Sequence, residues 1–288
     1  KEFSSKEDAL SFAEALIEAE LIVDLVDTKP SKRSPKAPFI TSTLQQEASQ
    51  KLGFSVKQTM SIAQNLYREG AITYMRTDSL NLSELAITGA EEEIVSKYGE
   101  QFHQARRYKT SSSGAQEAHE AIRPTDLTKP TILGLDDQSS KLYSLIYKRT
   151  LASQMSDAQL QKTKVTINVS GRSEHFIADG EILSFAGFLE VYDYMSSDDR
   201  LLPEISSNDV LTLVDMSSRE SFSRAKPRYT EASLVKEIEQ MGIGRPSTFA
   251  TMITTVQDRN YVVKDTREGA QREYQCIEIT CLLYTSPS

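Results

Sequence analysis

Hydrophobic residues recur at three- and four-residue spacing in several stretches of the chain, which is the pattern of helices that bury one face. Such helices are expected over residues 4–20, Thr41–Gly53, Ser55 to about Gly70, Ser83–Tyr98 and Asp136–Met155. Ser55 and Gln58 also match the capping box, in which two side chains satisfy backbone groups at a helix start. The pattern therefore predicts a chain in which helices alternate with other structure.

Alternating polar and apolar positions predict strands between and after these helices. A strand is expected over Leu21–Asp27, a hairpin over Val165–Ala178 that turns at Ser170-Gly171, and another strand over Val210–Val214. Proline breaks both helices and strand ladders, so the three prolines in Lys29–Pro38 predict a linker or a crossing between domains. Together these elements predict an α+β protein of several domains.

The order helix, glycine turn, helix, strand occurs twice, and it is the order of a winged-helix unit. The first copy runs from Thr41 through Gly53 to Tyr74. The second copy has a helix over Glu231–Met241, a turn at Gly242-Ile-Gly244, a helix over Pro246–Asp258 and a strand over Tyr261–Val263. Winged helices bind nucleic acid in some proteins and serve as scaffolds in others, so the repeat leaves both roles open.

The formal net charge of −8 argues against a histone-like nucleic-acid binder. Any DNA contact must come from local basic runs, although such runs are more often solvated faces; the clearest are Lys29–Lys36, Arg106–Lys109 and Arg219–Arg228. No apolar run approaches the roughly 18 residues of a membrane span, and the chain start lacks the apolar core of a signal peptide. Cys276 and Cys281 have no histidine close by, so neither a disulfide framework nor a zinc site is indicated, and a cytosolic protein is expected.

Within the stretch Ala71–Ser79, the six residues Tyr74–Ser79 gather one tyrosine, one arginine and three short polar side chains. Tyr74 is expected at a strand end, with Arg76 two residues on and on the same side; Thr77, Asp78 and Ser79 are residue types that cap the following helix. A phenol with a pKa of roughly 10 is barely ionised at neutral pH, so a nucleophilic tyrosine needs a cationic neighbour or a base. Arg76 supplies such a charge. From spacing alone, however, a packing role for Tyr74 is the commoner explanation.

Four segments together carry a resemblance to a known family. They occur in that family's order and approximate spacing, and they are Ala37-Pro-Phe-Ile-Thr-Ser-Thr-Leu-Gln-Gln46, Ile72-Thr-Tyr-Met-Arg-Thr-Asp-Ser79, Ala115-Gln-Glu-Ala-His-Glu-Ala-Ile-Arg-Pro-Thr125 and Gly242-Ile-Gly-Arg-Pro-Ser-Thr248. The chain resembles type IA DNA topoisomerases, and its third and fourth segments resemble the bacterial topoisomerase I branch. The expected fold is the α+β core of that family, with a β-rich gate arch and winged-helix (CAP-like) catalytic and strand-binding units.

The resemblance also implies a division into domains. Residues 1–36 and 159–226 are expected to form the two parts of the gate arch and to pair in space, on either side of a catalytic winged-helix-like domain at 37–158. Residues 227–280 are expected to be part of a single-strand-binding domain. We interpret residues 281–288, which depart from the family pattern, as a non-native tail derived from a sequencing adaptor.

The resemblance implies a catalytic role for three residues. Tyr74 is expected to attack a phosphodiester of single-stranded DNA and to become linked to the 5′ phosphate. Arg76 is expected to steady the phosphate and the charge on its oxygens in the transition state. His119 matches the family histidine that hydrogen-bonds near the scissile phosphate, although a lone histidine is more often structural.

Further residues are expected to contact DNA. Arg123 either touches a phosphate or holds its loop, and the sequence leaves these alternatives equal. Pro246 at a first helical position predicts an anion site at that helix start, whereas simple capping by Ser247 and Thr248 is an equal alternative. By resemblance the contacts to the strand come from Thr77, Asp78, Ser79, Arg123, Arg245, Ser247 and Thr248.

The resemblance implies Mg²⁺ but no ATP. In this family a Toprim domain supplies a glutamate and an Asp-x-Asp cluster that holds the ion; no Asp-x-Asp occurs here, so we expect no metal site in this chain and little cleavage by it alone. The expected partners are single-stranded and negatively supercoiled DNA, bound by a monomer in the bacterial cytoplasm at the nucleoid. The alternatives are a non-catalytic winged-helix DNA-binding module and a topoisomerase III-like decatenase.

Overall fold

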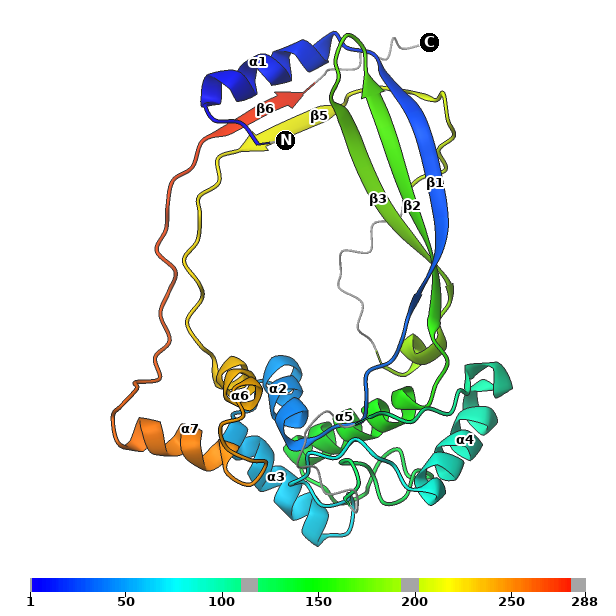
Figure 1. Cartoon of the computed structure of the whole chain (residues 1–288), viewed down its shortest axis with the longest axis vertical. Helices are drawn as coiled ribbons and strands as arrows, with labels where there is room; N and C mark the ends of the chain where they lie inside the picture. The colour runs from blue at the N-terminus through cyan, green and yellow to red at the C-terminus, as the bar shows by residue number, and fades with distance from the viewer. Residues whose placement is uncertain (1, 110–118, 193–201, 281–288) are drawn as a thin grey trace.

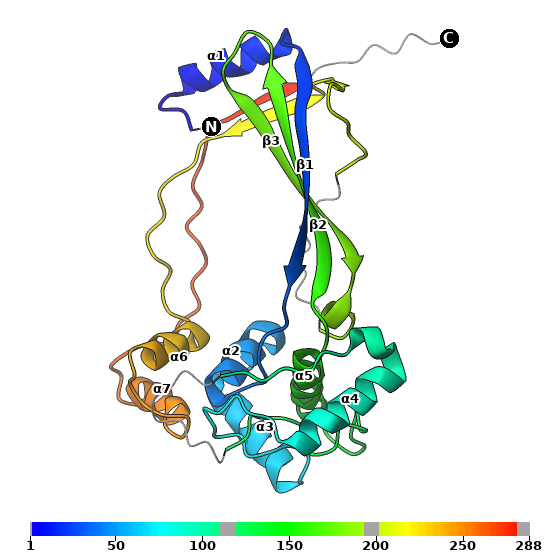
Figure 2. The ribbon, with the colours of Figure 1, turned by 45° about the vertical axis from the view of Figure 1, so that its right-hand side comes forward.

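A computed structural model describes residues 2–109, 119–192 and 202–280 of the chain. Its ribbon traces a closed frame (Figure 1). A twisted sheet forms one side, a helical body lies at one end, and two extended segments, residues 220–230 and 263–275, run side by side along the other side (Figures 1 and 2). The interpretation of residues 281–288 as a non-native tail concerns residues outside the described part.

The sheet pairs segments that lie far apart in the sequence. Its strands are antiparallel neighbours in the order β3-β2-β1-β4, and their bounds are β1 Leu21–Arg33, β2 Ala158–Val169, β3 His175–Phe185 and β4 Val210–Leu211. The register sets Leu21 against Val169 and Arg33 against Ala158. The expected pairing of residues 1–36 with residues 159–226 is therefore present, although the domain boundaries themselves stay a prediction.

The expected linker at Lys29–Pro38 is wrong over its first part, because β1 continues through Pro30 to Arg33. Pro30 lies opposite Gln161 of β2, whereas β4 pairs only with Leu21 and Ile22. Among the described residues β1 is thus an edge strand at Pro30, and an edge strand tolerates proline because no second ladder requires a backbone N–H there.

The sequence pattern located the β2–β3 hairpin but not every strand. The expected strand Val210–Val214 is shorter, since only Val210 and Leu211 pair in β4. A second sheet of two strands, β5 Asp215–Arg219 and β6 Cys276–Thr280, was not predicted. Beside it, α1 (Lys6–Ile17) closes the end of the frame opposite the helical body (Figure 1).

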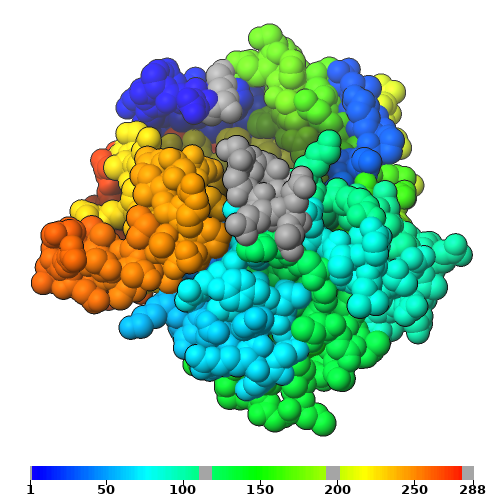
Figure 3. Space-filling model, turned by 60° about the horizontal axis from the view of Figure 1, so that its bottom comes forward, coloured from blue at the N-terminus to red at the C-terminus, as the bar shows by residue number. Residues whose placement is uncertain are grey.

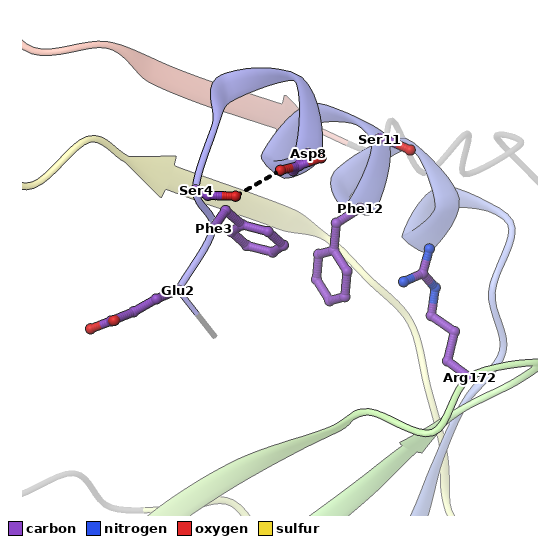
Figure 4. A pocket seen from close by; sticks show the side chains of 7 residues that line it. All are labelled: Glu2, Phe3, Ser4, Asp8, Ser11, Phe12 and Arg172. Carbon is purple, nitrogen blue, oxygen red and sulfur yellow. Dashed lines mark hydrogen bonds between the residues drawn. The ribbon is translucent and has the colours of Figure 1, made fainter.

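A small hollow lies under α1. Figure 4 shows the rings of Phe3 and Phe12 lying together there, with their centroids 5.1 Å apart. The Arg172 guanidinium, from the β2–β3 turn, lies 4.8 Å from the Phe12 centroid. This hollow is at the far end of the frame from α2 and α3, which flank the Tyr74 segment, so we assign it no part in the chemistry of that segment (Figure 1).

The helical body contains the predicted helices other than α1. Their bounds are α2 Thr41–Leu52, α3 Val56–Arg68, α4 Glu84–Tyr98, α5 Asp137–Ser153, α6 Glu231–Gln240 and α7 Phe249–Asp258, with short 3-10 helices η1 Glu100–Phe102 and η2 Gly187–Glu190. Ser55, Ser83 and Asp136 cap α3, α4 and α5 by accepting a backbone N–H. Only half of the expected capping box forms: the Ser55 hydroxyl accepts the Gln58 N–H, and the Gln58 side-chain amide donates to Gln138.

One large core joins α2, α3, α4 and α5. Its fully buried side chains include Leu44, Leu66, Ile94, Leu142 and Ile146. A smaller cluster of Val56, Val235, Phe249 and Ile253 joins α3 to α6 and α7. On the face shown in Figure 3, the α6–α7 pair therefore lies against the α2–α3 pair.

Each expected helix–turn–helix pair is present, but the strands expected after the pairs are not. Ile72 makes only an isolated bridge to Pro124, and Tyr261–Val263 form no strand and are exposed. Within the described residues, neither stretch lies beside a strand that could continue a ladder. The units thus share the helical part of a winged helix without its strands.

Candidate active site

The Tyr74 segment is attached to the segment that follows His119. The Thr73 N–H donates to the Arg123 carbonyl (2.9 Å), and the Thr73 hydroxyl donates to the Ala121 carbonyl (2.7 Å). The Arg123 N–H in turn donates to the Thr73 hydroxyl (3.0 Å). With the Thr125 N–H donating to the Ala71 carbonyl (3.0 Å), these bonds form one isolated bridge between Ile72 and Pro124 instead of the expected strand ladder.

The start of α2 holds the other side of the Tyr74 segment. The Thr41 hydroxyl lies 2.8 Å from the Met75 carbonyl and accepts the Thr77 N–H at 2.9 Å, and the Thr41 N–H donates to the Thr77 carbonyl (3.0 Å). Met75 is only 1% exposed. The backbone on both sides of Arg76 is therefore fixed by one buried threonine.

Tyr74 and Arg76 point away from this buried framework. Tyr74 is 44% exposed, and its ring packs edge-on against Tyr67, with the centroids 5.3 Å apart and the planes at 66°. Arg76 is exposed, and no residue in the described ranges bonds to its guanidinium. A fixed backbone that presents a phenol and a free guanidinium to solvent suits attack on a phosphate held by arginine.

Thr77 and Ser79 are buried and bond within the protein. The Ser79 N–H donates to the Thr77 hydroxyl (3.0 Å), and the Asn81 N–H donates to the Ser79 hydroxyl (3.2 Å). The expectation that Thr77, Asp78 and Ser79 cap the following helix is wrong, because Ser83 caps α4. Their contact with DNA stays a prediction; of the three, Asp78 is the one whose side chain is half-exposed.

His119 is exposed, and the part of its block at residues 115–118 lies outside the described residues. The rest of the block is attached to the body, since the Ala121 N–H donates to the Asn81 carbonyl (2.8 Å) and the Ile122 N–H donates to the Phe39 carbonyl (2.8 Å). The structure therefore brings the block beside the Tyr74 segment through backbone bonds. The role of the His119 side chain stays a prediction.

Arg123 is engaged in holding its loop. Its guanidinium donates to the Glu120 carboxylate (2.7 Å) and to the Pro124 carbonyl (2.9 Å). Partial burial alone would raise the pKa of Glu120, but the hydrogen bonds from Arg123 and Ser83 outweigh it and hold that pKa below its usual range. These contacts match the loop-holding alternative, and a phosphate contact by Arg123 stays a prediction.

Arg245, Ser247 and Thr248 lie on the turn before α7, and all three are exposed. The helix begins at Phe249 rather than at Pro246, because the Thr248 hydroxyl accepts the Arg245 N–H (2.8 Å) and closes a separate turn. The predicted placement of Pro246 at the first helical position is thus wrong. The Arg245 guanidinium donates only to the Gly244 carbonyl (2.7 Å) among described residues, so most of its donors face solvent.

Two of the three basic runs are largely neutralised by ion pairs. Lys32 and Arg106 both pair with Asp157 (3.2 and 2.5 Å), Arg33 pairs with Glu181, and Arg107 pairs with Glu84. In the third run, by contrast, no described residue pairs with Arg224, Lys226 or Arg228, which lie exposed along the segment 220–230. DNA contact by the first two runs would therefore have to break existing pairs.

The described part of the chain does not fit a magnesium site. Its residues contain no group of three or more His, Cys, Asp or Glu side chains that could hold a metal ion. Near the Tyr74 segment, the Glu120 carboxylate is already bound by Arg123. None of the described helices has both the length and the apolarity that a membrane crossing requires.

Sequence reasoning missed the residues that hold and flank the candidate nucleophile. Thr41 stands inside the first quoted segment, so its block was noticed although its contact with Met75 was not. Thr73 stands inside the second quoted segment, but its contacts with Ala121 and Arg123 were not predicted, and Tyr67 carried no pattern of its own. Only the folded chain shows that these three side chains surround the stretch that presents Tyr74 and Arg76.

Comparison with known proteins gives a consistent set of relatives. A family model described as DNA topoisomerase matches residues 1–280. The DNA topoisomerase 1 of Streptomyces coelicolor is 45% identical over 272 residues, which cover 89% of this chain and 29% of that protein. The DNA topoisomerase 1 of Vibrio cholerae is 45% identical over 265 residues, which cover 90% of this chain and 30% of that protein.

A solved structure agrees with these relatives. Full-length topoisomerase I from Thermotoga maritima superposes with a TM-score of 0.76 at 36% identity, over 92% of this chain and 44% of that one. The chain thus spans less than a third of the length of the curated relatives named above. It belongs to the DNA topoisomerase family, in its bacterial type IA branch.

Proposed function

We propose that this chain carries the nucleophile of an ATP-independent type IA topoisomerase that relaxes negatively supercoiled DNA. One observation supports this most: Tyr74 and Arg76 are exposed, while the backbone around them is held by hydrogen bonds from Thr41 and Thr73. The chain that presents them belongs to the DNA topoisomerase family. Single-stranded DNA is the proposed substrate.

In the proposed step the Tyr74 phenol loses its proton and its oxygen bonds to the phosphorus of one phosphodiester. The bond from phosphorus to the 3′ oxygen of the neighbouring nucleotide breaks, and that oxygen takes up a proton. Arg76 holds the phosphate oxygens as charge develops on them. One phosphodiester replaces another, so the released 3′ hydroxyl can reseal the strand after another strand has passed, without ATP.

The general acid for the 3′ oxygen is proposed to come from a Toprim domain outside this chain, together with Mg²⁺. The described residues of this chain contain no cluster of side chains that could hold the ion themselves. The isolated chain is then expected to cleave poorly. A monomer acting at the bacterial nucleoid is part of the same proposal.

Covalent trapping tests the proposal. The chain is mixed with a separately supplied Toprim-containing piece, Mg²⁺ and a single-stranded oligonucleotide labelled at either its 3′ or its 5′ end, and is then denatured on a gel. The proposal expects the 3′ label to migrate with the protein and the 5′ label to stay on a free, shorter strand. Tyr74→Phe should abolish the adduct. A protein-linked 5′ label would reverse the polarity and refute the type IA step.

A further inference from the structure

Tyr67 is a second exposed tyrosine beside the candidate nucleophile, and nothing above assigns it a role. It lies in the last turn of α3 and is 41% exposed, whereas its neighbour Leu66 is fully buried. The Tyr67 ring is therefore outside the buried stripe of the helix. Its hydroxyl bonds to no residue in the described ranges, so burial and hydrogen bonding do not explain its position.

The contact that Tyr67 does make is with Tyr74. The two ring centroids lie 5.3 Å apart and the planes meet at 66°, which is the edge-to-face geometry that aromatic pairs prefer. The two tyrosines are seven positions apart in the sequence, with the turn at Gly70 between them. The arrangement therefore depends on how α3 ends.

The end of α3 fixes Tyr67 firmly. The Gly70 N–H donates to the Tyr67 carbonyl (3.0 Å), and the Ala71 N–H donates to the Leu66 carbonyl (2.8 Å). Gly70 has a φ of +71°, a left-handed conformation that favours glycine and reverses the chain into the Tyr74 segment. Thr73 then attaches that segment to Ala121 and Arg123. The backbone that carries each ring is thus held in place by hydrogen bonds.

From this geometry we propose that Tyr67 is a positioning residue that holds the Tyr74 ring in the orientation from which its oxygen reaches the scissile phosphate. The proposal rests on the proposed function of Tyr74. An exposed tyrosine on a fixed backbone still rotates about its side-chain bonds, and each staggered rotamer carries the phenol oxygen to a different place. An edge-to-face neighbour favours one of these by roughly two- to tenfold.

The role predicted for Tyr67 needs the ring and not the hydroxyl. Tyr67→Phe should therefore cleave at the wild-type rate. Tyr67→Leu should slow single-turnover cleavage by roughly 1.5- to 2.5-fold, because the reactive one of three staggered Tyr74 rotamers loses its two- to tenfold preference. The affinity for uncleaved single-stranded DNA should stay unchanged in both. Leu85→Ala, which truncates an exposed side chain on α4, is the matched surface control.

The cleavage experiment uses the reconstituted mixture described above, with DNA affinity measured in parallel by filter binding. Retention of full cleavage by Tyr67→Leu would overturn the positioning role. A loss of DNA affinity large enough to explain the slower cleavage of Tyr67→Leu would also overturn it, because Tyr67 would then act by contacting DNA. An equal defect in Tyr67→Phe and Tyr67→Leu would overturn the ring-only role. Cleavage that survives Tyr74→Phe would instead remove the proposed function itself.

A spectroscopic readout tests the same contact without activity. In the chain labelled with 3-fluorotyrosine, the ¹⁹F resonance that disappears in Tyr74→Phe belongs to Tyr74. Loss of the neighbouring ring in Tyr67→Leu should shift that resonance, whereas Leu85→Ala should leave it in place. A Tyr74 resonance that stays unmoved in Tyr67→Leu would show that the rings do not hold each other in solution and would overturn the proposal.

Discussion

A buried ion pair at the base of the sheet should be essential for the stability of the helical body. The Arg149 Nη1 atom on α5 lies 2.7 Å from Oε2 of Glu47 on α2, and the Arg149 and Glu47 side chains are only 5% and 10% exposed. The other carboxylate oxygen, Oε1, accepts the Tyr192 hydroxyl (2.6 Å). Arg149 Nε also donates to the Ala37 carbonyl (2.7 Å), where the chain leaves the sheet and enters the body.

Removing one partner should cost much more than removing both. Arg149→Met keeps an apolar stem over the Phe39 ring but removes the buried cation of Glu47. The partly exposed Lys51, 3.6 Å from Oε1, is then the cation that remains beside that carboxylate, so the cost should lie near the lower end of the roughly 3–5 kcal/mol of a broken buried pair. In Arg149→Met/Glu47→Leu neither charge of the pair remains buried, so the double variant should lose much less unfolding free energy than Arg149→Met alone. The cycle should therefore give a coupling energy of about 2 kcal/mol or more.

Urea unfolding followed by circular dichroism at 222 nm measures these costs, because α2 and α5 share the main core. Lys141→Met is the matched control: it removes an exposed pair with Asp137 on the same helix, and such pairs contribute at most about 0.5 kcal/mol. A cost below about 1 kcal/mol for Arg149→Met, equal to that of the control, would refute the reasoning that the charge pair is buried and coupled.

Three further variants test other contacts. Thr41→Val should destabilise the body by about 1–3 kcal/mol and slow cleavage, because the Met75 carbonyl and the Thr77 N–H lose a buried partner. Thr41→Ser, which keeps the hydroxyl, should retain both the stability and the cleavage rate. A normal cleavage rate in Thr41→Val would count against the role of Thr41. Ser55→Ala should cost about 1 kcal/mol in thermal unfolding as the cap of α3 is lost, and no change would show that the cap is dispensable. The pKa of Glu120 is depressed in the folded state, so its carboxylate stabilises the fold above its unfolded pKa, and this stabilisation is lost as pH falls through the folded pKa. Glu120→Gln should therefore make the free energy of unfolding less dependent on pH below about pH 5. An unchanged slope would contradict this.

The helices could be predicted from the sequence because their evidence is local. The apolar stripe of α3 and the serine that caps it lie within one stretch of residues, and the helix begins next to Ser55 as expected. The strand predicted to carry Tyr74 does not form, because the contacts that decide it are not local. Ile72 and Met75 are buried, but Ile72 makes only an isolated bridge to Pro124 in a distant segment.

Non-local pairing explains the other misses. β5 and β6 lie about sixty residues apart in the sequence, and the polar stretch Asp215–Arg219 gives no period to recognise. Pro30 seemed to exclude a strand, but the edge of a sheet accepts it. At the site, Tyr74 and Arg76 were predicted from a resemblance, whereas Thr41 and Thr73 act through bonds to residues 34 and 48 positions away.

The measurement that tests the account most directly is the identification of the residue that carries the nucleotide. The covalent adduct from the reconstituted mixture is digested with protease and nuclease, and the modified peptide is sequenced by mass spectrometry. The account predicts a nucleotide joined through its 5′ phosphate to Tyr74, in the peptide that contains Met75 and Arg76. A nucleotide found on Tyr67, or on any other residue, would contradict it.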